Sequence, residues 1–250
     1  MPDRVRWPIL LMLLISLAVW ALSGRAGEQQ MNQQTTPFNG LDSQPLALAV
    51  AAGDTARIAA LATPQALGER GEQGITQLQW AILRQQPGSV QALLDAGADV
   101  AQTGMDGNSA LHIAAMVADA GYLTQLLAQQ PSVVDVRNAV SGATPLAAAV
   151  LAGRPAQVHQ LLDAAADSRL ADRVGDTPLH IAARINAPQV ALMLLQNGAD
   201  AAAVNQQGLT FQAYFAQTPR HLQNDAMRQA RQQLDDWLQA HRLAARYRVS

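Results

Sequence analysis

A pattern of apolar residues repeats along the chain at intervals of 32 to 35 residues. A leading leucine stands at Leu46, Leu78, Leu111, Leu146 and Leu179. A second leucine follows each of these fifteen residues later, at Leu61, Leu93, Leu126, Leu161 and Leu194. Self-similarity of this period is typical of repeat proteins, in which each unit buries its apolar face against its neighbours.

The unit at residues 175–208 shows what each repeat should form. Thr177 can cap the start of a helix, and Pro178 fits the first turn, where a missing N–H costs nothing. A short link then leads to a second run of helical periodicity, which ends near Gly198, a residue suited to a left-handed C-cap. The extended stretch that follows predicts a hairpin-like finger before the next repeat.

These residues carry a family resemblance. Residues 175–183 read GDTPLHIAA, and LLDAGAD at 93–99 and LLQNGAD at 194–200 complete the pattern, which resembles the ankyrin repeat signature. The resemblance implies an all-α solenoid of stacked helix pairs with short β-hairpin-like fingers. It covers residues 44–215, as about five repeats and a degenerate last unit. His112 and His180 occupy the signature histidine, which the family uses for local hydrogen bonding.

Three places depart from the pattern. The 35-residue step includes residues 129–142, which lack the usual ending, so the finger geometry there stays open. Pro155 enters its second helix early, where we expect a first-turn proline. Ala165 stands where other units have Gly97 and Gly198, so it must adopt an unfavourable conformation or end its helix differently.

Both ends of the chain lie outside the repeats. Residues 1–27 combine Arg4 and Arg6 with the uncharged run Trp7–Gly24, which predicts a signal peptide or an uncleaved signal-anchor transmembrane helix. Either would place the remainder in the periplasm, because the cationic end stays in the cytoplasm. Residues 28–43 read as a polar linker.

The C-terminal region, residues 216–250, predicts an amphipathic helix that caps the last repeat. Its apolar face would include Met227, Ala230 and Leu234. The alternative is a helix that binds a partner or a membrane surface through its C-terminal arginines, Arg242, Arg246 and Arg248.

Composition narrows the chemistry. Cysteine is absent, which excludes disulfides and thiolate metal sites. The net charge is −2 and there is no long basic run, which argues against nucleic acid as the main partner. HExxH, GxSxG and P-loop motifs are also absent, and His159 lacks a partner at metal-ligand spacing. We therefore expect no metal, no cofactor and no enzyme. The alternative is an unrecognised catalytic site in the C-terminal part, around His221 or His241.

The resemblance implies binding through the finger tips and through the residues that follow the Ala-Ala pair of each first helix. The positions concerned are Leu83, Arg84, Met105, Met116, Val117, Val140, Leu151, Arg173, Val174, Arg184 and Ile185. We expect Met116, Val117, Leu151 and Ile185 to form an exposed apolar stripe flanked by arginines. The alternative is that the longer repeat shifts the packing and buries several of them.

The sequence thus predicts a non-enzymatic protein-protein interaction module in the bacterial envelope. Two versions resemble known uses of exported bacterial ankyrin proteins. One is immunity to a secreted toxic effector, such as an antibacterial phospholipase. The other is support of a periplasmic enzyme such as a catalase. The oligomeric state stays open, and contact with membrane is expected only through the N-terminal segment.

Overall fold

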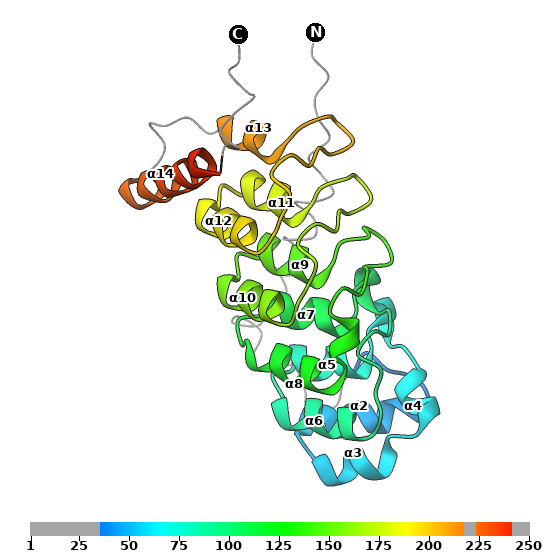
Figure 1. The fold of residues 1–250 in the computed structure, drawn as a ribbon. Coiled ribbons are helices and arrows are strands. Elements are labelled where there is room, and N and C mark those ends of the chain that lie inside the picture. Colours follow the sequence, from blue (N-terminus) through cyan, green and yellow to red (C-terminus); the bar gives the residue numbers. More distant parts are fainter. Residues whose placement is uncertain (1–35, 218–223, 242–250) are drawn as a thin grey trace. The chain divides into compact units, whose positions relative to one another are not determined.

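The computed structural model describes residues 36–217 and 224–241, and in this part of the chain all regular structure is helical (Figure 1). The α-helices are α2 (Ser43–Ala52), α3 (Thr55–Leu61), α4 (Pro64–Gly68), α5 (Gln77–Leu83), α6 (Pro87–Asp95), α7 (Ala110–Met116), α8 (Gly121–Gln129), α9 (Pro145–Leu151), α10 (Pro155–Asp163), α11 (Pro178–Arg184), α12 (Pro188–Gln196), α13 (Phe211–Ala216) and α14 (Asp225–Ala240). Three short 3-10 turns are η1 (Glu72–Gly74), η2 (Met105–Gly107) and η3 (Pro131–Val133). The predicted all-α solenoid is confirmed.

The helices begin where local chemistry predicts. The Thr144 hydroxyl accepts the Ala147 N–H at 3.3 Å at the start of α9, and the Thr76 hydroxyl accepts the Gln79 N–H at 3.2 Å at the start of α5. Second helices begin with a first-turn proline at α6, α10 and α12. Pro155 therefore sits as expected.

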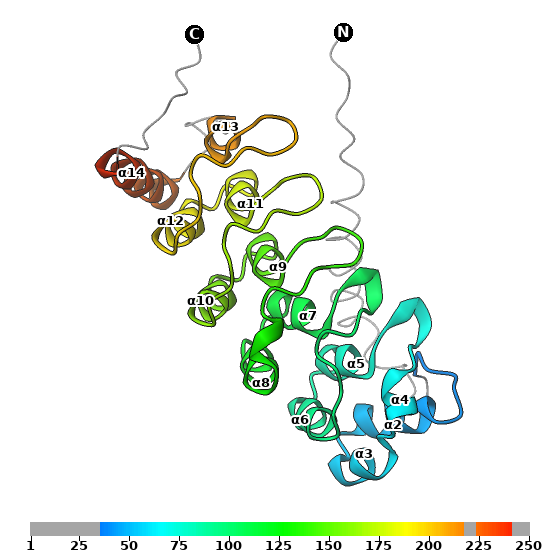
Figure 2. The same cartoon turned by 45° about the vertical axis from the view of Figure 1, so that its right-hand side comes forward.

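Helix pairs stack into two rows. The first helices, α2, α5, α7, α9, α11 and α13, pack in succession, and the second helices, α3, α6, α8, α10, α12 and α14, form a parallel row (Figure 2). The recurring leucines of the sequence lie between the rows in one hydrophobic core, and all are buried except Leu61, which is half-buried. Each repeat therefore buries its apolar face only by stacking.

Ala165, which stands where other repeats have glycine, adopts the unfavourable backbone conformation. Its φ is +62°, close to the left-handed conformation of Gly97 and Gly198, whose φ angles are +87° and +84°. The Ala165 N–H still donates to the Leu162 carbonyl at 2.9 Å. Helix α10 thus ends like its neighbours, with alanine in a backbone region that favours glycine.

The fingers differ from the expectation in one respect, because they contain no strand within the described residues. Each finger is closed by few backbone bonds, such as Gly104 N–H to the Asn108 carbonyl at 2.7 Å, and the tip turns through a left-handed residue. Such a loop is too short for a strand ladder. In the longer repeat, Asn138 N–H donates to the Ala143 carbonyl at 2.8 Å, so the finger geometry is kept and η3 absorbs part of the extra length.

The C-terminal helix α14 packs against α12, with Ala230, Leu234 and Leu238 buried, so it covers the last repeats as predicted for a cap. Arg231 lies over the Phe215 ring of α13 at 4.2 Å. The arginines of the alternative interpretation, Arg242, Arg246 and Arg248, lie outside the described residues.

The predicted leader at residues 1–27 also lies outside the described residues, as does the first half of the predicted linker, residues 28–35. Within the described ranges, every helix is too short or too polar to cross a lipid bilayer.

Candidate protein-binding surface

From residue 104 onward, the fingers form a continuous row because backbone hydrogen bonds connect each to the next. Ala139 N–H donates to the Gly107 carbonyl at 2.9 Å, and Arg173 N–H donates to the Ser141 carbonyl at 2.9 Å. The last finger continues the series through Gln206 N–H, which lies 3.1 Å from the Val174 carbonyl. Loops joined in this way present their tips in fixed positions (Figure 2).

Large apolar side chains are exposed on this row. Val140 is 65% exposed and Val174 is 55% exposed, each at a finger tip. Ile185, which is 37% exposed, lies off the row at the C-terminal end of α11. All three belong to the predicted binding set. The other exposed large apolar side chains in the described residues are Leu41, near the N-terminal end of the described chain, and Val204, just before the last finger.

The remaining apolar residues of the predicted set are half-buried and pack against the core; they are Leu83, Met105, Met116, Val117 and Leu151. The next repeat partly explains this. Arg154 Nε donates to the Met116 carbonyl at 2.9 Å, and Gln157 Nε2 donates to the Val117 carbonyl at 2.7 Å. Of the predicted apolar stripe, Met116, Val117 and Leu151 are therefore less exposed than expected. The more exposed apolar side chains of the predicted set are those at the finger tips.

The three predicted arginines lie in different surroundings. Arg84 lies over the Trp80 ring at 5.4 Å, and Arg173 Nη2 donates to the Ala139 carbonyl of the preceding finger at 2.8 Å. Arg184 forms an ion pair with Asp176, whose side chain is only 2% exposed. Arg184 is thus held by a buried carboxylate, while Arg84 and Arg173 form no ion pair in the part of the chain that the structure describes.

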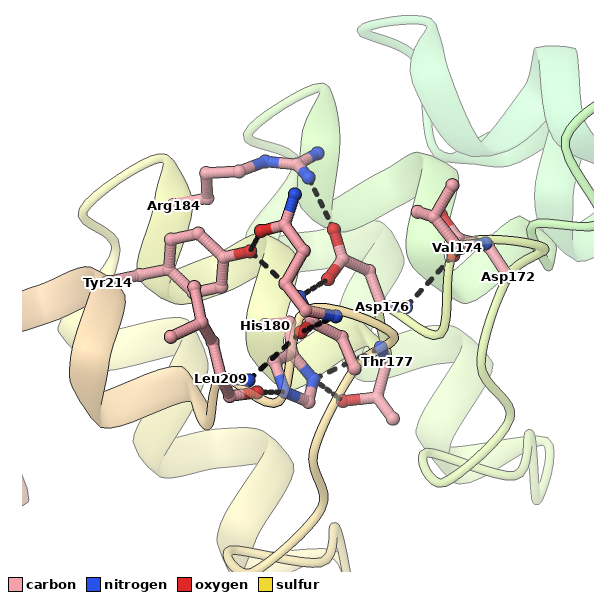
Figure 3. Close-up of polar contacts among 10 residues, drawn as sticks. Asp172, Val174, Asp176, Thr177, His180, Arg184, Leu209 and Tyr214 are labelled. Carbon is pink, nitrogen blue, oxygen red and sulfur yellow. Dashed lines mark hydrogen bonds and ion pairs between the residues drawn. The ribbon is translucent and has the colours of Figure 1, made fainter. Parts of the chain in front are cut away.

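Asp176 is the centre of a polar cluster between the last repeats (Figure 3). Asn205 Nδ2 donates to Asp176 Oδ1 at 2.8 Å and also lies 2.8 Å from the Tyr214 hydroxyl. Asp172 Oδ1 accepts the N–H groups of Val174 and Asp176, both at 2.9 Å. Because each of these groups is engaged, the cluster fixes the finger at 171–176 relative to α11 and α13.

Burial changes the proton affinity of two groups in this cluster. Desolvation raises the pKa of the Asp172 carboxyl, against the opposing effect of its backbone hydrogen bonds. Desolvation also raises the pKa of the Tyr214 phenol, and the nearby Asp176 charge adds to this. The Tyr214 hydroxyl is therefore held in its protonated form.

The signature histidines make the local bonds that the resemblance implies. His180 Nδ1 accepts the Thr177 N–H at 3.2 Å, and His180 Nε2 lies 3.0 Å from the Leu209 carbonyl of the next repeat. His112 makes the equivalent bonds to Ser109 and Ala143. Desolvation lowers the pKa of His112 to about 4, which keeps this imidazole neutral.

The other histidines lie apart from one another. His159 Nδ1 bonds to Asp163 in the same helix at 2.7 Å, and His241 Nδ1 bonds to the Trp237 carbonyl one turn earlier at 2.8 Å. His221 lies outside the described residues. Over residues 36–217 and 224–241, no three histidine or acidic side chains gather in a way that could hold a metal ion.

Sequence reasoning missed two residues that organise this surface. Gln79 follows Leu78 as His112 follows Leu111, and its Nε2 donates to the Asn108 carbonyl of the next repeat at 2.8 Å. Arg137 Nη1 donates to the Gly142 carbonyl at 2.9 Å and also bonds to the Ala171 carbonyl. Register alignment would have found Gln79, whereas the longer repeat obscured Arg137.

Comparison with known proteins gives consistent results. A family model described as ankyrin repeats, three copies, matches residues 85–172 and 111–205. Protein PhlB of Serratia liquefaciens is 58% identical over 188 residues, which cover 74% of this chain and 82% of PhlB. Neurogenic locus notch homolog protein 2 of Homo sapiens is 36% identical over 113 residues, but these are only 4% of that protein.

Solved structures show the same fold. The ankyrin repeat domain of Bcl-3 superimposes with a TM-score of 0.63 at 24% identity, covering 85% of this chain and 95% of that one. The ankyrin repeat protein EF0377 gives a TM-score of 0.62 at 22% identity, covering 70% of this chain and 92% of that one. At these identities the likeness concerns the fold alone.

Proposed function

The chain belongs to the ankyrin repeat family, whose repeats serve as protein-protein interaction modules, and from this premise we propose that it holds a partner protein on its finger row. The contact surface comprises the tips of the neighbouring fingers at 137–143 and 171–176, which are joined by the bond from Arg173 N–H to the Ser141 carbonyl. The observation that carries the proposal is the exposure of Val140 and Val174 at two neighbouring finger tips.

Two properties of these side chains favour binding. Covering exposed apolar groups with a partner stabilises the complex by about 25 cal/mol per Å² of apolar area removed from water. The fingers are already joined through backbone bonds, including Ala139 N–H to the Gly107 carbonyl. Binding therefore requires little additional ordering of the loops, which favours affinity.

For the biological role, we propose that the partner is a secreted or envelope enzyme and that this protein covers it as an immunity factor in the periplasm. The cationic and apolar pattern of residues 1–27 supports the location. The alternative is that the protein supports a periplasmic enzyme, such as a catalase, rather than blocking one. The two versions predict opposite effects on the bound enzyme.

The test is affinity capture from envelope extracts of the source bacterium, with quantitative mass spectrometry of the retained proteins. The full chain should retain a partner that the Val140→Glu, Val174→Glu double variant loses, because a carboxylate would be buried at the contact. Leu41→Glu is the matched control, since Leu41 is 95% exposed and distant in sequence from the finger row. The captured enzyme is then assayed with and without the protein.

Inhibition of the captured enzyme would support immunity, and activation would support the accessory role. Equal retention by the full chain and the double variant would contradict the proposed surface, provided that thermal unfolding shows both to be folded.

A further inference from the structure

Two arginines that contact the finger of residues 137–143, Arg137 and Arg173, form no ion pair within the described residues. Arg137 donates to the carbonyls of Gly142 and Ala171, so its guanidinium ties its own finger to the next. Arg173 Nη2 reaches back to the Ala139 carbonyl at 2.8 Å. Within the described part of the chain, the ion pairs involve other arginines, namely Arg169, Arg184 and Arg228.

The two guanidinium groups flank an exposed apolar side chain. Ala139 and Gly142 enclose the tip that carries Val140, and each of their carbonyls accepts a bond from one of the arginines. Val140 is 65% exposed, so it stands uncovered between two ordered cations.

The acidic groups closest to these arginines in sequence bond to backbone N–H groups. Asp135 Oδ1 accepts the Asp167 N–H at 3.1 Å, and Asp172 Oδ1 accepts the N–H groups of Val174 and Asp176. Desolvation raises the pKa of the Asp135 carboxyl and the nearby Arg137 charge partly offsets this, but the two side chains form no ion pair within the described residues. An exposed carboxylate, Asp106, lies on the preceding finger, whose backbone is tied to Asn138. It forms no ion pair within the described residues.

We infer that this finger binds a segment of the partner protein in which one or more acidic residues stand beside an aliphatic residue. The carboxylate meets Arg137 and Arg173, and the aliphatic side chain covers Val140. This inference rests on the proposed function and specifies the chemistry of its partner.

The arrangement suits such a segment for a physical reason. A guanidinium has five N–H donors, and only one or two are used here by backbone carbonyls, so several remain for a carboxylate. Both side chains are already ordered, which lowers the entropy lost on binding.

The chain supplies a matched control arginine. Arg70 occupies the same position in its finger as Arg137, and its Nε donates to the Thr103 carbonyl of the next finger at 2.7 Å. Its finger contains Glu69 and Glu72 and exposes no large apolar side chain. Arg70→Gln therefore removes the same kind of structural bond without touching the proposed site.

The test uses two libraries of short displayed peptides that are identical except at one central position. One library fixes Leu-Glu at the centre and the other fixes Leu-Gln, and each is selected on the full chain. We expect the Glu library to be enriched roughly tenfold or more over the Gln library. The preference should disappear with Arg137→Gln, Arg173→Gln and persist with Arg70→Gln.

The outcomes separate the inference from the proposed function. Equal enrichment of both libraries, no enrichment of either, or a preference that survives in the Arg137→Gln, Arg173→Gln variant would overturn the inference. Selected peptides that bind the Val140→Glu, Val174→Glu variant as well as the unmodified chain would instead contradict the proposed surface. Displacement of the peptides by a single-stranded oligonucleotide at low concentration would reassign the arginines to nucleic acid and also overturn the inference.

Discussion

His112 Nε2 lies 3.0 Å from the carbonyl oxygen of Ala143, so the imidazole of one repeat bonds directly to the finger of the next. The other ring nitrogen, Nδ1, lies 3.2 Å from the Ser109 backbone nitrogen and 2.8 Å from the Ser109 hydroxyl. A nitrogen that accepts the Ser109 N–H cannot carry a proton, so the imidazole is neutral with its proton on Nε2. One side chain thus caps its own helix and joins two repeats.

We predict that His112→Ala lowers the free energy of unfolding by about 2–4 kcal/mol, because it leaves buried polar groups without partners. His112→Gln should cost less, since Gln79 already makes equivalent bonds in the preceding repeat. Urea denaturation followed by circular dichroism measures both. Equal losses for the two variants would show that ring packing, and not the bonding pattern, sets the cost.

The same histidine predicts a dependence of stability on pH. Its pKa in the folded protein is about 4, against the ordinary histidine value of 6.5 in an unfolded chain. As pH falls below 6.5, His112 becomes protonated in the unfolded state but stays neutral in the folded state. The free energy of unfolding therefore decreases as pH falls toward 4. The contribution is at most about 3 kcal/mol.

Burial also raises the pKa of Asp172, and this shift acts on stability in the opposite sense. The comparison is therefore between the unmodified chain and His112→Gln, each measured by urea denaturation at several pH values. The difference between their unfolding free energies should shrink as pH falls from 6.5 to 4. A difference that is independent of pH would contradict the assignment.

The end of α10 offers a stabilising substitution. Ala165 has a φ of +62°, so Ala165→Gly should raise the unfolding free energy by about 0.5–1 kcal/mol by relieving backbone strain. Gly97→Ala is the reciprocal change at a position with φ of +87° and no other atom near the added methyl, and it should cost about 1 kcal/mol. Thermal unfolding measures both, and shifts of the same sign would refute the strain argument.

The cap makes a separate prediction. Leu234 in α14 is buried against the core, so Leu234→Ala should destabilise the protein by about 2–4 kcal/mol. Its neighbour Gln233 is exposed, and Gln233→Ala should have almost no effect. Hydrogen exchange of the amides in α12 should accelerate in the Leu234 variant. If exchange there is unchanged, α14 does not protect the last repeats.

Much of the fold could be predicted from sequence because the same local sequence signals occur in each repeat. The capping threonines and first-turn prolines fix where helices begin, and the leucine register fixes which face is buried. The surface was harder to predict. Met116 and Val117 are half-buried, and bonds from Arg154 and Gln157 of the next repeat reach their carbonyls, a relation between repeats that no single repeat encodes.

The exposed valines show the opposite case. Val140 and Val174 lie at finger tips, where the turn geometry alone directs the chain away from the core, so their exposure was predictable. The role of Arg137 was not, because its partner Ala171 belongs to the next finger and the longer repeat shifts the register between them.

The central claim is that a partner protein covers the finger row, and site-specific photocrosslinking tests it most directly. A photoreactive amino acid is placed at Val140, or at His159 on the row of second helices as the control, since both side chains are exposed. Irradiation in the source organism should yield a crosslinked product from Val140 and little or none from His159. Crosslinking from His159 with none from Val140 would contradict the claim.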